Sequence, residues 1–420
     1  MPYDLLLKSG HVLDPGQGLD GTFDIGITDG KIVAIAPEIA ESEGKKVLRV
    51  DGPDRYVAPG LIDLHTHVAF GAQTAGVGMG SCDPDAIGVH SGVTTVLDAG
   101  SVGVANFGVF RAHILPNATT RVFTFVNAGS FAHTMPGLGG DFDSMDEINR
   151  DAIAKCVEAN PGLVQGVKLR AVGPIIDERG EDVARACLDI AREHNVPLMV
   201  HIGDPGFGRK LAPEKLSEVT RFLLRNFAPG DILTHLCTPS HGSVLDDSKN
   251  PFPELEEAHK NGVVLDSALG MGNFGYIVAE RQAQIGVYPD TISSDLTAGG
   301  QSFQSLMECM SKFMAIGYSL SDVVKMTTSN SARALGLQES LGAIAVGREA
   351  DITVFDVLTG DFKFKDTTKL LAAGNFKFAE PDKGEFGGHY GIVPVQTVKA
   401  GELFAPHWGT HPWGWAPEAA

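Results

Sequence analysis

Residues 58–67 read APGLIDLHTH, and this stretch indicates the fold of the whole chain. An apolar run follows Gly60 and ends at His65 and His67. On a β-strand, residues i and i+2 point to the same side, so both imidazoles would enter one space. An imidazole nitrogen binds zinc at about 2.0–2.1 Å, so two histidines on one strand can share an ion. The alternative is a chance pair at an exposed strand end, because such a pair alone has moderate specificity.

The same arrangement recurs at three later points in the sequence. His201 ends the run PLMVH, His235 ends DILTH, and Asp295 ends TISSD. One histidine of this kind could be a core residue with satisfied hydrogen bonds. A buried histidine or carboxylate is costly without partners, however, and packing alone does not explain four such strand ends. A shared metal site would supply the partners.

Strand-like and helix-like segments alternate through the middle of the chain. EDVARACLDIAREHN (181–195) and EKLSEVTRFLLRNF (214–227) are helical in pattern. The alternation implies parallel strands joined by crossover helices, and eight units in about 280 residues fit an α/β fold of the (β/α)8 TIM barrel type. An open doubly wound sheet is the alternative, and the connection between the third and fourth strands is loose. The predicted strands span residues 60–67, 94–98, 121–127, 164–169, 197–201, 231–235, 262–266 and 291–295.

Both ends of the chain are rich in strand patterns. The Asp29-Gly30 pair stands between two apolar runs, which is a strong hairpin signal. Near the other end, EADITVFDV (349–357) and VQTVKAGELF (395–404) are also strand-like. We therefore expect both ends to form one small composite β-sandwich domain beside the barrel, and an irregular tail HWGTHPWGWAPEAA. The predicted division is 1–58 and 341–420 for the β-domain and 59–340 for the barrel.

The composition is that of a globular protein, with 420 residues of which 43% are hydrophobic and 20% are charged. A formal net charge of −19 argues against nucleic acid or an anionic membrane as the main partner. The five cysteines include no CxxC pair, which favours free thiols and a reducing compartment. The first stretch, MPYDLLLKSGHVLDPG, is interpreted as a strand and not as a signal peptide, and no run reaches the roughly 20 apolar residues that a membrane helix needs. We expect a soluble, cytoplasmic homo-oligomer that acts on a small molecule.

Lys168 lies near the end of the fourth predicted strand, in GLVQGVKLRAVG. An ammonium group would be repelled by a metal cluster, so the ordinary role of this lysine is a solvated charge or an ion pair. A neutral lysine amine can instead add CO₂ and become a carbamate, which is an anionic oxygen ligand able to bridge two cations.

Together these motifs resemble the binuclear amidohydrolase superfamily. The resemblance lies in HTH on the first strand, lysine on the fourth, histidines on the fifth and sixth and aspartate on the eighth. The flanking stretches GVTTVLDAG, SNSARALGL and LGAIAVGREADITVFD also agree. GVKLRA, VHIGDP and PDTISSDL are similar to the amidohydrolase/deacetylase branch, which has a dihydroorotase-like site.

The resemblance implies two divalent metal ions, held by His65, His67, Lys168, His201, His235 and Asp295. The first two histidines would hold the more buried ion, and the other two would hold the second. Lys168 would bridge both ions as a carbamate. Zinc is the metal most often implied, although manganese, cobalt or iron would also suit this ligand set.

The implied chemistry is hydrolysis by a metal-activated hydroxide, because coordination lowers the pKa of water from 15.7 toward about 7. Asp295 would be the catalytic residue, accepting the water's proton and passing it to the leaving group. No GxSxG elbow supports serine catalysis. The Gly-rich stretch SALGMGNFG (267–275) is interpreted as a flexible loop at the barrel mouth.

The leading hypothesis is hydrolysis of an amide or ester bond in a small acylated substrate, as in a deacetylase. Alternatives are cyclic amide hydrolysis, as in dihydroorotase or hydantoinase, deamination of a nucleobase-like ring, and a non-catalytic scaffold. A scaffold need not keep six ligands. The substrate loops depart from the branch: ALG stands at residues 268–270 where GHG is frequent, and Thr297 stands where His is frequent.

Five further residues lie near the predicted site. Arg170 shares the strand face of Lys168, so it could bind a substrate carboxylate with its planar fork or pair with a loop acid. Three residues at or beyond strand ends, Asn127, His133 and His241, could line the pocket, but we interpret them as solvated loop positions. Cys237, two residues past His235, is interpreted as a small buried filler.

Overall fold

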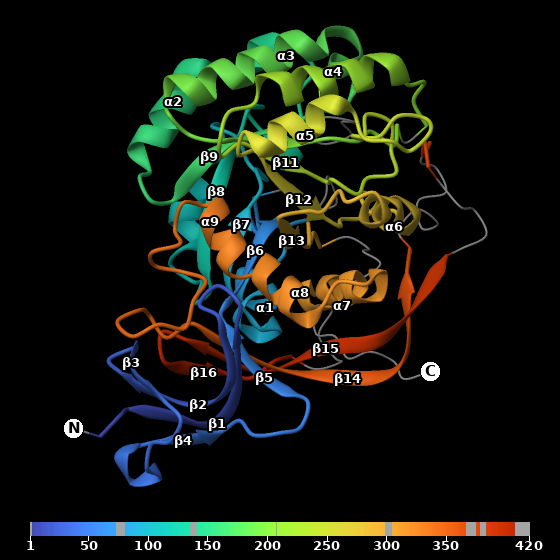
Figure 1. Cartoon of the computed structure of the whole chain (residues 1–420). Helices are drawn as coiled ribbons and strands as arrows, with labels where there is room; N and C mark the ends of the chain where they lie inside the picture. The colour runs from blue at the N-terminus through green and yellow to red at the C-terminus, as the bar shows by residue number, and fades with distance from the viewer. Residues whose placement is uncertain are drawn as a thin grey trace.

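Eight parallel strands form a nearly closed barrel in the computed structural model of this chain (Figure 1). The structure describes residues 2–72, 80–134, 141–206, 208–298, 305–366, 375–378 and 384–407. Neighbouring strands pair in sequence order, and a bridge between Thr66 and Leu296 joins the last strand to the first. All eight predicted strands are present, which confirms the (β/α)8 barrel. They are β6 (Leu61–Thr66), β7 (Val93–Asp98), β8 (Arg121–Asn127), β9 (Val164–Arg170), β10 (Leu198–His201), β11 (Ile232–Thr234), β12 (Val264–Ala268) and β13 (Thr291–Ser293).

Helices pack around the barrel strands (Figure 1). In α4 the buried positions Leu216, Val219 and Leu223 recur every three to four residues, which is the spacing of one helix face. The loose connection between β8 and β9 contains α2. The helices are α1 (Pro84–Ile87), α2 (Arg150–Ala159), α3 (Pro174–Glu193), α4 (Pro213–Asn226), α5 (Pro253–Lys260), α6 (Tyr276–Gln284), α7 (Leu306–Ile316), α8 (Leu320–Met326) and α9 (Ser329–Ala334). The short 3-10 or π segments are η1 (Glu41–Glu43), η2 (Val89–Ser91), η3 (Phe110–Ile114), η4 (Ala132–Thr134) and η5 (Met145–Glu147).

The two ends of the chain build a second, separate sheet, as predicted. Its order is β16-β15-β14-β5-β1-β2-β3, and β4 pairs with β1. Asp29 and Gly30 form the two-residue turn between β2 and β3 with φ of 50° and 70°, which is the backbone that an Asp-Gly hairpin turn requires. Arg55 donates to Asp356 at 2.7 Å across 301 residues of sequence. The strands are β1 (Leu5–Asp14), β2 (Leu19–Thr28), β3 (Lys31–Ala36), β4 (Val47–Arg49), β5 (Arg55–Pro59), β14 (Ile352–Lys365), β15 (Glu385–Lys399) and β16 (Glu402–Phe404).

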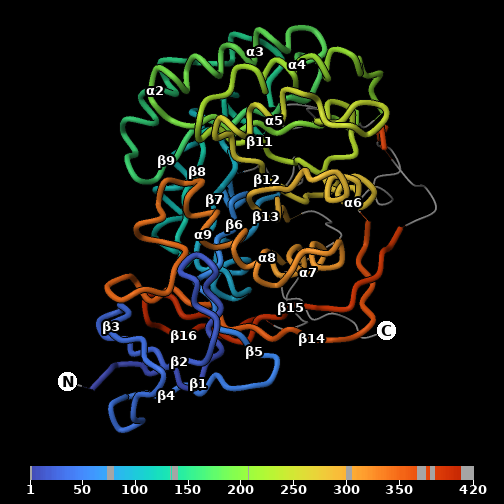
Figure 2. Tube along the Cα trace, viewed as in Figure 1, coloured from blue at the N-terminus to red at the C-terminus, as the bar shows by residue number. Residues whose placement is uncertain are grey.

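The long β14–β15 hairpin leaves the β-domain and runs along the barrel toward α6 (Figure 2). Phe386 on β15 stacks on Tyr276 at the start of α6, with ring centroids 4.1 Å apart. Beyond β14, the amide of Asn375 donates to Pro205 at 2.6 Å, and the amide of Phe378 donates to Pro239 at 2.9 Å. These two prolines lie in the loops that follow β10 and β11. The β-domain therefore contacts the barrel mouth directly.

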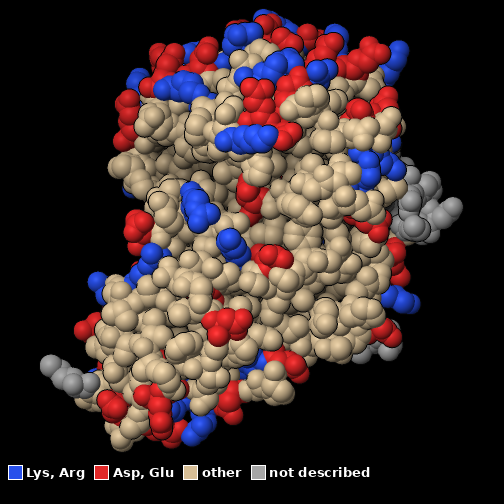
Figure 3. Space-filling model, in the orientation of Figure 1, with Lys and Arg blue, Asp and Glu red and all other residues tan. Residues whose placement is uncertain are grey.

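The structure also bears on the predictions about cysteines, membrane spans, surface charge and the C-terminal tail. Each of the five cysteines lies in the described part of the chain and has a free thiol, as expected. No helix among the described residues is long and apolar enough to cross a bilayer. On the face in Figure 3, charges of both signs are interspersed over α3, α4 and α5. Residues 408–420 of the predicted irregular tail lie outside the described residues, and the exact domain division stays a prediction.

Candidate metal centre

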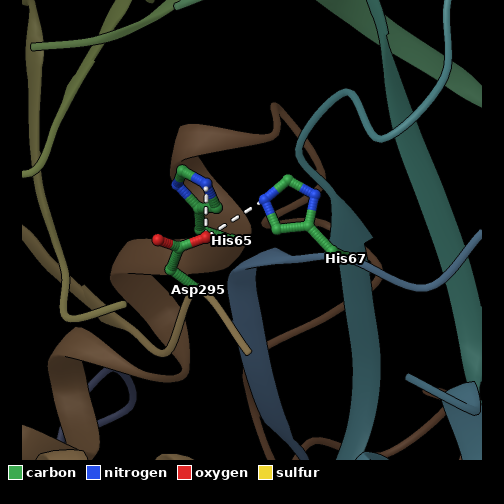
Figure 4. A group of neighbouring side chains, drawn as sticks. All are labelled: His65, His67 and Asp295. Atoms are coloured by element: carbon green, nitrogen blue, oxygen red, sulfur yellow. Dashed lines mark ion pairs between the residues drawn. The ribbon is translucent and has the colours of Figure 1, made fainter. Parts of the chain in front are cut away.

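Three side chains meet at the C-terminal end of the barrel strands (Figure 4). His65 is on β6, His67 follows that strand, and Asp295 follows β13. The Nε2 atoms of His65 and His67 lie 3.4 Å and 3.0 Å from Oδ1 of Asp295. Among the described residues, no other group of three His, Cys, Asp or Glu side chains brings its ligand atoms within 4.8 Å of one another.

The backbone turns sharply where two of these strands end. His235 and Asp295 have φ of 69° and 53°, a left-handed conformation that is uncommon for residues other than glycine. The amide of Asp295 donates to the carbonyl of His65 at 2.6 Å, and the amide of His67 donates to Leu296 at 3.0 Å. These hydrogen bonds to β6 hold the turn in place and direct the Asp295 carboxylate inward.

Hydrogen bonds at Nδ1 orient both histidines of the HTH motif. Nδ1 of His65 lies 2.9 Å from the Thr234 hydroxyl, and Nδ1 of His67 lies 2.8 Å from the Ser101 hydroxyl. The Nε2 atoms consequently face Asp295. A carboxylate oxygen and a lone-pair nitrogen at 3.0 Å repel each other unless a proton or a cation lies between them.

His235 and His201 extend this cluster. Their ring centroids are 4.0 Å apart, and the His235 ring is 4.9 Å from that of His65. Nδ1 of His235 lies 2.9 Å from the carbonyl oxygen of Ala268. Its Nε2 is buried, 4.0 Å from Asp295, and has no hydrogen-bond partner in the described part of the structure. A buried polar atom of this kind needs a partner, and a metal ion would fit it.

Lys168 lies on β9 and is completely buried. Its Nζ is 3.3 Å from Nε2 of His65 and 3.5 Å from the sulfur of Met199. Burial lowers the pKa of Lys168 to about 7, so a substantial fraction of the amine is neutral near physiological pH. A neutral amine is the form that can add CO₂.

The surroundings also set the charges of the other groups. Burial lowers the pKa of His235 to about 3, and burial together with the charge of Lys168 holds the pKa of His65 well below its ordinary value. Burial alone would raise the pKa of Asp295, but its close contact with His67 and the charges nearby lower it overall. Neutral imidazoles and an ionised carboxylate are the protonation states that bind metals.

The structure brings the six predicted ligand-type residues into one buried cluster. Asp295 is held further by the loop after β12, where Asn273 Nδ2 donates to its Oδ2 at 3.2 Å. A Cβ on Gly270 would lie 2.1 Å from the same oxygen, so glycine is required for this approach. In the same loop Phe274 is fully buried and packs near Phe313. This loop, which the sequence suggested to be flexible, is therefore packed against the barrel.

Arg170 pairs with a loop acid, Asp141, which is one of the two roles expected for it. Its Nη1 lies 2.9 Å from the buried carboxylate of Asp141, and its buried Nε has no hydrogen-bond partner among the described residues. The interpretation of Asn127 as a solvated position is wrong. Asn127 is fully buried, and its amide is satisfied there by donating to Asp141 at 2.7 Å and to Gly100 at 3.0 Å.

The remaining candidates lie farther from the cluster. His241 is half-buried, and burial lowers its pKa. The side chain of His133 lies outside the described residues. Cys237 is buried, and its thiol donates to Gln282 at 3.0 Å, which agrees with its interpretation as a filler.

Several residues at the site were missed in the sequence. The Thr234 and Ser101 hydroxyls donate to two buried carboxylates, Asp266 and Asp98 respectively, both at 2.7 Å. Both aspartates end or lie in apolar strands, as the predicted ligands do, so a signal was available. No sequence pattern pointed to Asn273, because its contact with Asp295 depends on the geometry of the loop.

Comparison with known proteins identifies the family. Residues 56–384 match the family described as "Amidohydrolase family". The chain belongs to the amidohydrolase family. This amidohydrolase is 31% identical to a deacetylase of Brucella anthropi over 384 residues, which cover 91% of this chain and 89% of the relative. It is 30% identical to a deacetylase of Agrobacterium fabrum over 341 residues, which cover 81% of this chain and 79% of the relative.

Solved structures with the same architecture include enzymes with different names. One, the crystal structure of an adenine deaminase, matches with a TM-score of 0.79 and 26% identity, covering 96% of this amidohydrolase and 100% of that chain. Another, the crystal structure of a dihydroorotase, matches with a TM-score of 0.77 and 27% identity, covering 96% of this amidohydrolase and 99% of that chain. Together these findings make the protein a hydrolase that acts on carbon–nitrogen bonds.

Proposed function

We propose that this amidohydrolase binds two divalent metal ions and removes the acyl group from a small, carboxylate-bearing compound, as a deacetylase does. Deacetylases of two bacteria resemble the chain over most of its length. The observation that carries the metal proposal is the orphaned, buried Nε2 of His235, which faces the same space as Asp295 and the other histidines.

The metal ligands in this proposal are the six clustered side chains, His65, His67, Lys168, His201, His235 and Asp295. When bound, the metals supply Lewis acidity, which polarises a carbonyl and acidifies water. We propose zinc, with Lys168 as a carbamate whose two oxygens would serve both ions. The lowered pKa of Lys168 supports this modification, because only the neutral amine reacts with CO₂.

Asp295 performs the proton transfers in the proposed reaction. Its Oδ1 faces His65 and His67, and its Oδ2 is held by Asn273. Ionised Asp295 accepts a proton as water adds to the acyl carbon, and it returns that proton to the leaving nitrogen or oxygen. One water is consumed, and the products are the acid and the deacylated compound.

Arg170 supplies the proposed recognition of the substrate carboxylate. It lies two residues past Lys168 at the end of β9, and its side chain is only 15% exposed. The ion pair with Asp141 fixes one arm of the guanidinium, which leaves the rest of its planar fork to bind an anion.

Cyclic amide hydrolysis is a second candidate, because the dihydroorotase structure has 27% identity and a TM-score of 0.77. Both reactions need the same metals, so only tests with different substrates can distinguish deacylation from cyclic amide hydrolysis. Metal analysis of protein purified without chelators should give about two ions per chain. A screen of N-acyl amino acids, acyl hydroxy acids and cyclic imides should show turnover of the first or second group. A metal-free preparation with full activity would refute the proposal.

A further inference from the structure

Two buried hydroxyl groups stand between ligand histidines and buried carboxylates, in the same arrangement on two sides of the site. Nδ1 of His65 lies 2.9 Å from the Thr234 hydroxyl, which donates to Oδ2 of Asp266 at 2.7 Å. The direct separation between Nδ1 of His65 and that carboxylate oxygen is 3.9 Å. All three residues are at most 1% exposed.

The second arrangement involves His67 and comes from different strands. Nδ1 of His67 lies 2.8 Å from the Ser101 hydroxyl, which donates to Oδ2 of Asp98 at 2.7 Å. Asp98 ends β7, and Ser101 follows it in the adjoining turn. Each histidine of the HTH motif therefore contacts a hydroxyl group, and a carboxylate holds that hydroxyl in place by a hydrogen bond.

The number of hydrogens available shows which group donates in each histidine–hydroxyl–carboxylate arrangement. Asp266 accepts hydroxyl hydrogens from Thr234, Thr291 and Ser293, so hydroxyl donors surround both of its oxygens. Asp98 accepts from the hydroxyl and the amide of Ser101 and from the amide of Val68. A hydroxyl has one hydrogen. Because that hydrogen goes to the carboxylate, the oxygen can only accept from Nδ1–H of the histidine.

We propose that Thr234 and Ser101 are positioning residues that hold His65 and His67 as the tautomers with hydrogen on Nδ1. Each Nε2 then presents a lone pair to the metal site. This inference rests on the proposed metal function, and it adds two residues that orient the metal ligands. The hydroxyl also keeps the carboxylate away from the imidazole, so each histidine remains a neutral ligand made more basic by its hydrogen bond.

The affinity of the metal-free protein for Zn²⁺, measured by competition with a chromophoric chelator, tests this inference. Thr234→Val removes the hydroxyl and keeps the shape, whereas Thr234→Ser keeps the hydroxyl. We expect about 10- to 100-fold weaker binding for the valine variant and near-wild-type binding for the serine variant. Thr220→Val is the matched control, since this buried threonine on α4 donates only to carbonyl oxygens. It should lower thermal stability without changing zinc affinity.

Ser101→Ala tests the second arrangement independently, and it keeps the inference testable if Thr234→Val does not fold. Unchanged zinc affinity in both folded variants would overturn the inference and leave the proposed function intact. Equal weakening in Thr234→Val and Thr234→Ser would also overturn it, because packing would then be the cause. A wild-type protein without zinc affinity would overturn the proposed function together with the inference.

Discussion

Asp295 combines a strained backbone with a carboxylate fixed at both oxygens. Its φ of 53° is held by the hydrogen bond to His65, and Asn273 and the HTH histidines contact its side chain. Such strain is sustained only where surrounding contacts determine the geometry. A base fixed in this way loses little freedom when the substrate arrives.

Asp295→Asn should lower kcat by about 10²- to 10⁴-fold while most of the bound metal remains. The amide still offers an oxygen ligand but cannot accept the proton from water. Steady-state kinetics and metal analysis of the same preparation check this. Asp290→Asn is the control, because Asp290 lies at the opposite end of β13 and binds the Leu265 amide. Activity of Asp295→Asn within a few-fold of wild type would remove this residue from the role of base.

Lys168→Ala should bind metal weakly and lose activity, and short carboxylic acids such as formate should restore part of both. The argument rests on charge, since an ammonium beside divalent cations is repelled and an added carboxylate can replace the missing anion. Metal content and kcat, measured across a formate series, check this. Lys312→Ala is the control, because Lys312 is an equally buried lysine outside the cluster. A bare Lys168 amine beside a fully occupied metal pair would contradict the carbamate.

Metal-dependent activation of the metal-free protein should be pH-dependent. Burial places the pKa of Lys168 at about 7, so the reactive neutral amine falls roughly tenfold per unit below pH 7 and is dominant above it. At constant dissolved CO₂, the activation rate should therefore rise through pH 7 and then level off. Formate-supported activation of Lys168→Ala should lack this rise. A flat profile in the wild type would exclude carbamate formation as the limiting step.

At the scale of elements, the loop after β12 shapes the site as much as the strands do. Gly270 has no side chain, so the Asp295 carboxylate can lie close to its backbone. Asn273, in the same loop, donates a hydrogen bond to that carboxylate. The loop is covered in turn by the β14–β15 hairpin, because Phe386 lies near Phe274 with ring centroids 6.5 Å apart. Loop and hairpin together hold the proposed base.

Gly270→Ala should reduce kcat/KM by about 10²-fold, because the added Cβ would displace a reacting group by about 1 Å. Kinetics together with metal analysis will distinguish a misplaced base from lost metal. Gly286→Ala is a matched control, since Gly286 also has a positive φ of 77° but has nothing within 4 Å of its Cβ position. Equal effects of both substitutions would show that backbone strain, and not contact with Asp295, is responsible.

The strands and the ligand cluster were predictable because their signals are local. A buried parallel strand is a continuous apolar run, and the polar residue that ends it is visible in the sequence. The contacts between Asn273 and Asp295, and between Asn127 and Asp141, leave no such pattern. The first contact joins two loops and the second joins the end of β8 to a loop, and the positions of these loops depend on the assembled barrel. For the same reason Asn127 was expected in solvent, although it is buried.

At the scale of the whole molecule, metal binding should contribute directly to stability. A metal that binds only the folded state stabilises it by about 4 kcal/mol when its free concentration is 1,000 times Kd. Thermal unfolding should therefore shift to lower temperature after chelation and return on adding Zn²⁺. A His65→Asn variant should show a much smaller shift. Identical unfolding of the wild type with and without metal would contradict this prediction.

The pairing of β5 with β14 has a consequence for biosynthesis. Arg55 and Asp356 are 301 residues apart, so the barrel is translated between the two strands that must pair. At about 5–20 residues per second, β5 leaves the ribosome roughly 15–60 s before its partner exists. During that interval its edge is open to strands of other nascent chains. Aggregation during expression should therefore be most sensitive to chain termination before β14.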